Sequence, residues 1–201
     1  MTTAAPTERA LARRQQVLDA ASDAFRRRGF HAASMAEIAK LAGMSPGHIY
    51  NLFENKDEII AAIVERDCED VVQRIGELQQ EVDVLQAMLR ETDKAIDEHS
   101  QVADAALELE VLAEASRNPR LAAVMHASQA LVHAKALGLI RQTLGPAAAE
   151  LPDGEIEGRA LLLAALFNGL TALSVRLPDQ HKRIPVMAPV MRRLLQVLLA
   201  P

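Results

Sequence analysis

The 201-residue sequence is poor in the residues that reinforce a fold through covalent links or aromatic packing. Cys68 is its one cysteine, tryptophan is absent, and aromatic residues make up 2% of the chain. A single cysteine excludes an internal disulfide and any cysteine-clustered zinc site. Because half of the residues are hydrophobic, the core must be built from aliphatic side chains, alanine and methionine.

Long apolar runs and strand-like alternation are also lacking. The longest apolar run, residues 160–175, is about 16 residues long and contains Asn168, which is too short for a membrane span of about 20 residues. No period-two run of β-branched residues lies between turn signals, which favours an all-helical chain. The N-terminus has no apolar signal-peptide core. We therefore expect an all-α, cytoplasmic protein that does not bind membranes.

The stretch 34–56 does contain an unusual density of helix-start signals. Ser34 precedes a glutamate by three residues, which predicts a capping box, and Gly43 permits the left-handed turn that ends a helix. Ser45 is the expected N-cap of the next helix, with Pro46 at its first position. A third start follows at an asparagine three residues before another glutamate. Such closely spaced starts predict a helix-turn-helix.

The second helix of this pair has two unlike faces. Ile49 and Phe53 are four residues apart and, with Leu52, can pack against Ile38 and Met44 of the first helix and the turn. The remaining side chains point outward, and their chemistry suits DNA: a glycine for close approach, donors and acceptors for base edges, and a hydroxyl for a phosphate. An ordinary solvated helix is the alternative. The outward residues are Gly47, His48, Tyr50 and Asn51.

These residues belong to a longer run that is similar to a known family. The run from about Arg9 to Arg66 resembles the N-terminal DNA-binding domain of TetR/AcrR-type transcriptional regulators, through QVLDAASDAFRRRGF, ASMAEIAKLAG, MSPGHIYNLF and NKDEIIAAI. The resemblance implies a homodimeric regulator, most often a repressor, whose helix 45–53 enters the major groove while Tyr50 and Lys56 hold phosphates. The residues expected at the DNA interface are therefore Ser34, Ser45, Gly47, His48, Tyr50, Asn51 and Lys56.

The charge distribution agrees with such an interface although the net charge of −5 does not. Residues 1–56 contain eight Lys and Arg against five Asp and Glu, which gives +3 and leaves −8 for the rest. A basic N-terminal domain on an acidic body concentrates the attraction for DNA phosphates at one end.

The periodicity predicts three regions. Residues 1–8 form a disordered tail, residues 9–55 the helix-turn-helix domain, and residues 56–201 a helical domain for effector binding and dimerisation. One long helix over residues 56–80 joins the two domains. Further helices are expected within 85–99, over 102–117, from the break at Asn118-Pro119 to residue 144, over 155–177, and from Pro185 or Pro189 to Leu199. A loop is expected over 145–154.

The last two predicted helices are apolar on more than one face. One face can pack on the body, and the other favours a two-fold four-helix bundle, so we expect a homodimer through residues 155–199. A central core helix is the alternative. The apolar stripe of the last helix contains Met187, Val190, Met191, Leu194 and Leu198, with Val186 and Val197 outside it.

Polar residues interrupt the apolar stripes of the body, and together they suggest a mostly apolar cavity for a small-molecule effector. Each could instead lie at a stripe edge or bond to the backbone. Few aromatic residues favour aliphatic or acyl-like ligands. His126 and His133 lack the further close ligands of a metal site, and no cofactor is expected. The candidate cavity residues are Cys68, Met88, Thr92, His99, Glu110, Met125, Ser128 and Lys135.

Two other classes of function compete with a regulator. An enzyme could use Cys68 with His99 or His126 as nucleophile and base, but no phosphate loop, nucleophile elbow or metal-binding spacing surrounds them. A helical adaptor would use the C-terminal helices to bind another protein, and it leaves the capped helix pair unexplained. The sequence therefore favours an effector-responsive repressor that binds a double-stranded inverted-repeat operator and has no catalytic residue.

Overall fold

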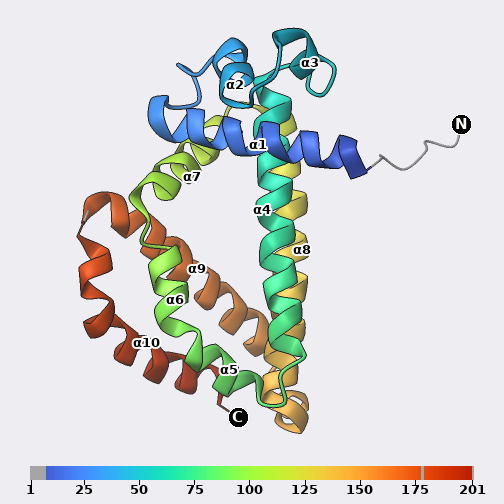
Figure 1. Cartoon of the computed structure of the whole chain (residues 1–201). Coiled ribbons are helices and arrows are strands. Elements are labelled where there is room, and N and C mark those ends of the chain that lie inside the picture. Colours follow the sequence, from blue (N-terminus) through green and yellow to red (C-terminus); the bar gives the residue numbers. More distant parts are fainter. Residues whose placement is uncertain (1–7, 178, 201) are drawn as a thin grey trace, which may run out of the picture. The chain divides into compact units, whose positions relative to one another are not determined.

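A computed structural model describes residues 8–177 and 179–200, and all regular secondary structure in these residues is helical (Figure 1). The all-α prediction is confirmed. Residues 1–7 of the predicted tail lie outside the described residues, and Glu8 begins the first helix. The helices are α1 (Glu8–Arg28), α2 (Met35–Leu41), α3 (Pro46–Tyr50), α4 (Lys56–Gln79), α5 (Val84–Arg90), α6 (Thr92–Glu98), α7 (Val102–Ala115), α8 (Pro119–Leu144), η1 (Gly145–Ala149), α9 (Glu155–Arg176), η2 (Gln180–Arg183) and α10 (Ile184–Leu199).

The described residues form two compact units. Unit 1 contains those up to Arg66 together with Leu107–Met125, and unit 2 contains Asp67–Ala106 and those from His126 onward. Helices α4, α7 and α8 each contribute residues to both units. The predicted division into residues 9–55 and 56–201 is a division by function, and it stays a prediction. The compact units divide the chain differently, since residues 56–66 and 107–125 belong to the same unit as the helix-turn-helix.

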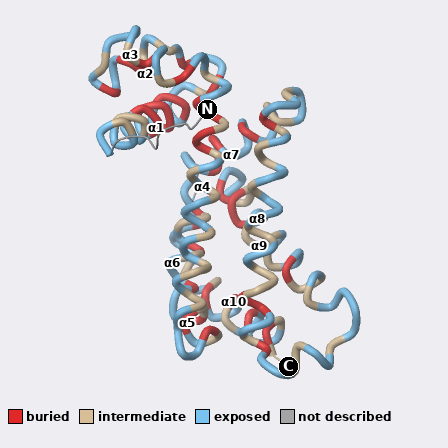
Figure 2. Tube along the Cα trace, turned by 90° about the vertical axis from the view of Figure 1, so that its right-hand side faces the viewer, coloured by how far each residue is buried: buried red, intermediate tan, exposed pale blue. Residues whose placement is uncertain are grey.

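Unit 1 has a core of buried aliphatic and aromatic residues. Buried positions along the chain are red in Figure 2. The helical period of α1 predicts that Val17, Leu18, Ala21 and Phe25 share one inward face, and all four are buried. The α2–α3 pair contributes its own inward side chains to the same core. These include Ile38, Ile49 and Phe53, with Met44 and Leu52 packed against them.

Unit 2 has a second core in which α10 packs on α5 and α6. The single stripe predicted over residues 85–99 is divided between two helices at Glu91, where φ is −80° and ψ is −2°. The Thr92 hydroxyl donates to Met88 O at 3.1 Å. This oxygen is the acceptor that the backbone N–H four residues later would use in a continuous helix, so the hydroxyl competes with that bond. The predicted loop after residue 144 begins with the 3₁₀ helix η1.

Several predicted inward positions are exposed, and these predictions were wrong. The apolar period of the helix over 56–80 predicts an inward Val71, which is 43% exposed. The helix over 102–117 is apolar on two faces, which predicts burial on both, but Val102, Leu109 and Leu112 of α7 are exposed. In α10 the buried face is shifted from the predicted stripe, because this helix packs on α5 and α6. The buried residues of α10 are Ala188, Met191, Leu195 and Leu199, whereas Val190 and Leu194 face outward with Val186 and Val197.

Helix α9 is longer than the apolar run in the sequence suggested. Its 22 residues, with a mean hydropathy of 1.5 over the most apolar window, are long and apolar enough to cross a membrane by length and composition alone. Only 28% of that window is buried inside the chain. Core and interface helices of soluble proteins share this composition, so one such helix is weak support for a membrane span.

Candidate DNA-binding site

The site is built on two short helices whose first turns are capped by serine. Ser34 Oγ accepts from Glu37 N at 3.2 Å, and Ser45 Oγ accepts from His48 N at 3.3 Å, with Pro46 in the first turn of α3. Each cap satisfies a backbone N–H that has no partner inside its helix. Both N-caps were predicted and both are confirmed.

The turn between the two helices depends on Gly43, which has φ +62°. A side chain at this φ would be strained, and the predicted left-handed turn is confirmed. Gln16 of α1 holds the end of α2 from outside, because its Nε2 donates to Ala42 O at 2.8 Å. The pair α2–α3 is therefore fixed both by its own turn and by α1.

The acidic half of each predicted capping box has a different partner from the one expected. Glu37 Oε1 lies 3.0 Å from Arg28 Nε, so this carboxylate ties α2 to the end of α1 rather than to its own N-cap. At the start of α4, Asn55 Oδ1 accepts from Glu58 N at 3.0 Å as predicted, but Glu58 Oε2 accepts from Glu54 N at 2.6 Å. At the first site an ion pair with Arg28 competes with the capping-box bond of Glu37. At the second site the Glu58 carboxylate accepts from the N–H one residue before the expected Asn55.

The outward face of α3 is open to a partner. Tyr50 is 56% exposed, Asn51 is exposed at the C-cap, and a Cβ added at Gly47 would meet nothing within 4 Å. Ile49 lies between them in sequence and is fully buried, so the outward face has a rigid base. The hydroxyl and the amide can make hydrogen bonds to phosphate or base edges, and the glycine allows close backbone approach.

His48 is held by a residue of α1. Its Nε2 lies 2.9 Å from Arg13 Nη1. Because a guanidinium only donates, Nε2 accepts this bond, and a neutral ring would then carry its proton on Nδ1. Arg13 therefore orients the imidazole and leaves one nitrogen for a partner.

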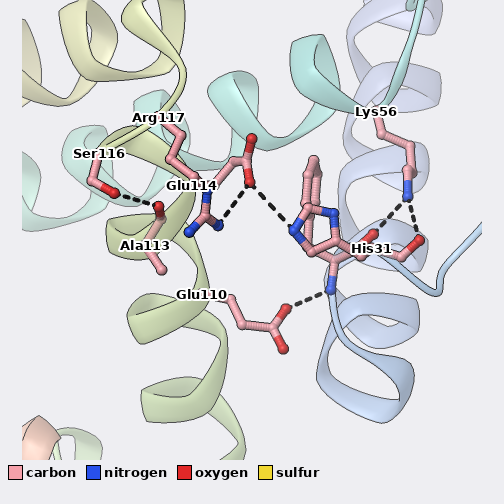
Figure 3. Close-up of polar contacts among 8 residues, drawn as sticks. His31, Lys56, Glu110, Ala113, Glu114, Ser116 and Arg117 are labelled. Atoms are coloured by element: carbon pink, nitrogen blue, oxygen red, sulfur yellow. Dashed lines mark hydrogen bonds and ion pairs between the residues drawn. The ribbon is translucent and has the colours of Figure 1, made fainter.

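Lys56 makes two bonds within unit 1, at the turn between α1 and α2 (Figure 3). Its Nζ donates to Phe30 O at 2.7 Å and to His31 O at 3.0 Å, and it lies 5.0 Å from the centroid of the Phe30 ring. On the same turn, Glu110 Oε2 accepts from Phe30 N at 2.5 Å. Sequence reasoning placed Lys56 on DNA and Glu110 in the effector cavity, and it did not find this turn.

The candidate cavity residues are divided between the two units. Glu110 and Met125 belong to unit 1 and the other six to unit 2. Within unit 2, Cys68 Sγ donates to Ser128 O at 3.4 Å, and His99 Nδ1 lies 2.8 Å from Ala95 O. These polar groups bond to backbone carbonyls, as the alternative interpretation of the stripes expected for each residue alone. Lys135 is exposed.

A buried polar residue of unit 2 was not predicted. Gln180 is fully buried, and its Nε2 donates to Ser100 Oγ at 2.9 Å and to Leu170 O at 3.2 Å. The Ser100 hydroxyl donates in turn to Ile96 O at 2.6 Å, so both partners of the amide must accept and its orientation is fixed. Gln180 Oε1 is a buried oxygen without a hydrogen-bond partner. The surrounding sequence, DQHKR, is polar and gave no signal of burial.

The ring of His99 packs against that of Phe167 in unit 2, with ring centroids 5.0 Å apart. In the part of the chain that the structure describes, no three His, Cys, Asp or Glu side chains are grouped so that they could hold a metal ion. The chemistry of unit 2 is therefore that of hydroxyl, amide and imidazole groups in an aliphatic core.

Two serine-capped helices around a glycine turn, with a rigid inward face and a polar outward face, define a helix-turn-helix DNA-binding regulator. Residues 17–63 match the family model described as bacterial regulatory proteins, tetR family, and residues 82–200 match that of the BetI-type transcriptional repressor, C-terminal. The chain belongs to the tetR family of bacterial transcriptional regulators, as the sequence resemblance predicted.

Similar proteins of known sequence and structure support this family membership. The chain is 34% identical over 112 residues to the HTH-type transcriptional regulator UidR of Escherichia coli K12, and the match covers 56% of each protein. It thus spans about half the length of the curated relatives it matches. The structure of Salmonella enterica GusR has a TM-score of 0.76 at 28% identity, covering 94% of this chain and 96% of that one. The SmeT–triclosan complex has a TM-score of 0.65 at 25% identity, covering 90% of both.

Proposed function

We propose that this regulator is a homodimeric repressor that binds an inverted-repeat operator in the cytoplasm and is released by a small-molecule effector. The observation that carries the proposal is the α3 surface, where Gly47, Tyr50 and Asn51 are presented outward on the fully buried Ile49. Bases would be read by His48 and Asn51, and a phosphate would be held by Tyr50. Ser34 and Ser45 place these contacts through their caps.

Dimerisation is supported by the apolar surface of α9 and α10. Leu161 and Leu162 of α9 are 55% and 60% exposed, and Val186 and Val197 of α10 are each 74% exposed. Several large apolar side chains exposed on two helices of one unit favour an interaction site. A second copy of the chain is the partner that suits a helix-turn-helix, because a two-fold axis presents two recognition helices to two half-sites.

An effector site in unit 2 is supported by Gln180. A buried carbonyl oxygen without a partner is costly, and a ligand that donates a hydrogen bond there would remove that cost. The aliphatic surroundings favour an aliphatic molecule with a hydroxyl or amine group. The SmeT structure contains triclosan, and so a structurally similar protein binds a small molecule.

The experiment that tests the function is a mobility-shift assay with the full-length protein and the DNA upstream of its own gene, followed by footprinting. We expect a protected inverted repeat and salt-dependent binding. Protein that binds no DNA fragment from the neighbouring genes would contradict the proposal and favour an adaptor. Pairs of aliphatic alcohols and their methyl ethers then test the effector class, since only the alcohols can donate to Gln180 Oε1.

A further inference from the structure

The turn that joins α1 to α2 is held from both sides by charged residues that come much later in the chain. Gly29 has φ +81° and ends α1, which leaves the next peptide groups without helical partners. Glu110 of α7 accepts from Phe30 N at 2.5 Å, while Lys56 of α4 donates to Phe30 O and His31 O at 2.7 and 3.0 Å. We call Glu110, Lys56 and the turn Gly29–His31 the turn clamp.

The space around the turn is fitted to the carboxylate. A Cβ added at Gly29 would lie 2.7 Å from Glu110 Oε1, so only glycine allows both the positive φ and the bond at Phe30 N. One helical turn further along α7, Glu114 lies 3.4 Å from His31 Nε2 and 3.4 Å from Arg117 Nη2 (Figure 3). Two acidic residues of α7 thus hold one end of α1 and the approach to α2.

We propose that Glu110 is a positioning residue for operator binding, which acts through the turn and touches neither DNA nor effector. The inference rests on the proposed function, because it assumes that the α2–α3 pair reads an operator. The turn leads through buried Ala33 to the N-cap of α2, and α2 packs on both α1 and α3. A change at the turn therefore changes the placement of the recognition helix.

The negative charge of Glu110 allows a test in which the two explanations predict opposite changes in operator affinity. Glu110 is an anion in the DNA-binding unit, so removing it would raise operator affinity if only its repulsion of phosphates mattered. If it positions the turn, Glu110→Ala lowers affinity instead, by about tenfold for the loss of one charge-assisted hydrogen bond. Glu110→Gln keeps an acceptor oxygen for Phe30 N and restores most of the affinity while carrying the same charge as the alanine variant.

Lys56 separates positioning from phosphate contact through the salt dependence. A lysine that neutralises one phosphate contributes about 0.9 to the slope of log K against log salt. We expect Lys56→Met to lower the affinity and to flatten this slope by about one unit, because the two carbonyls are neutral and leave the charge and the third N–H of the ammonium for a phosphate. An unchanged slope would overturn this phosphate contact and leave Lys56 acting through the turn alone, as Glu110 does.

The experiments use the full-length dimer, with operator affinity measured by fluorescence anisotropy at several salt concentrations. Hydrogen exchange at the Phe30 amide gives a direct structural readout, and we expect faster exchange in Glu110→Ala than in wild type or Glu110→Gln. The exposed Glu65 of α4 provides a matched control, since Glu65→Ala removes an equal charge and should not lower affinity.

The outcomes are distinguishable. Wild-type protein without operator binding refutes the proposed function. Wild-type binding together with unchanged or raised affinity in a folded Glu110→Ala dimer, or equal losses in the Ala and Gln variants, refutes the positioning role of Glu110. Circular dichroism and sedimentation confirm that each variant is a folded dimer, and Glu110→Gln keeps the test decisive if the alanine variant unfolds.

Discussion

The two units differ in what they leave on their surfaces. Unit 1 buries Ile38, Ile49 and Phe53 almost completely and presents a polar α3 face beside them. Unit 2 has fully buried residues too, such as Ile96 and Ile140, yet its α9 and α10 expose leucines and valines along their length. The surface proposed to meet DNA is thus polar over a buried base, whereas the surface proposed to meet a second copy of the chain exposes leucines and valines.

The largest effect is expected from breaking the apolar surface of unit 2. Leu162 is 60% exposed on α9, and Leu162→Glu would place a charge in the proposed dimer interface, where burying it is costly. We expect monomers in sedimentation experiments and an operator affinity about 100-fold lower, because two half-sites are then bound independently.

A matched control lies in the same unit. Val82 is fully exposed between α4 and α5, so Val82→Glu introduces an equal charge without touching α9 or α10 and should remain dimeric. A wild-type monomer at micromolar concentration, or a dimeric Leu162→Glu protein, would contradict the proposed interface.

Truncating the buried side chain under the recognition helix α3 tests the comparison in unit 1. Ile49 is fully buried under α3, and Ile49→Ala should lower the free energy of unfolding by about 3 kcal/mol through the lost methylene groups and the remaining cavity. Operator binding should weaken while the dimer persists. Denaturant unfolding of Leu11→Ala, a truncation at a 52% exposed position of α1, is the control and should change little.

The helix-turn-helix could be predicted because its signals are local. Ser34, Gly43, Ser45 and Pro46 act within a few residues of their positions in the sequence, and each has the predicted role. Even there, the partner of the Glu37 carboxylate was wrong, since Arg28 is brought close by the α1–α2 turn rather than by helix geometry. Local chemistry predicts caps better than it predicts ion pairs.

Long-range packing explains what the sequence could not provide. The buried face of α10 depends on contact with α5 and α6, and a helix that is apolar on several sides has no pattern that selects one face. Gln180 lies in a polar segment but is buried by bonds to Ser100 and Leu170. The bond from Phe30 N to Glu110 spans 80 residues, and neither residue type at its position indicates the other.

A smaller effect is expected at the outward face of α3. Tyr50→Phe removes a hydroxyl that is proposed to hold a phosphate, so operator affinity should fall by about 1 kcal/mol, which is the net value of one hydrogen bond. The loss should be similar for all operator variants, since phosphates carry no base identity. Anisotropy measured on a set of single-base operator variants checks this, and a loss confined to particular bases would assign Tyr50 to base reading instead.

The smallest effect concerns Arg13, which is proposed to act on base reading through His48. Because Arg13 Nη1 lies 2.9 Å from His48 Nε2, it fixes the orientation of the ring, and Arg13→Gln shortens the donor and frees the imidazole. We expect a shift in preference among single-base operator variants of about 1 kcal/mol or less, at the same positions that respond to His48→Ala.

The double variant decides whether the two residues act together. If Arg13 works through His48, Arg13→Gln should change base preference in wild type but not in a His48→Ala background, since side chains in contact are not additive. Arg13 also carries a charge, so its removal could weaken binding to every sequence, and that uniform loss would persist in both backgrounds. A preference shift that survives in the His48→Ala protein would show that Arg13 reads DNA itself. The contact between Arg13 and His48 would then not explain the base preference.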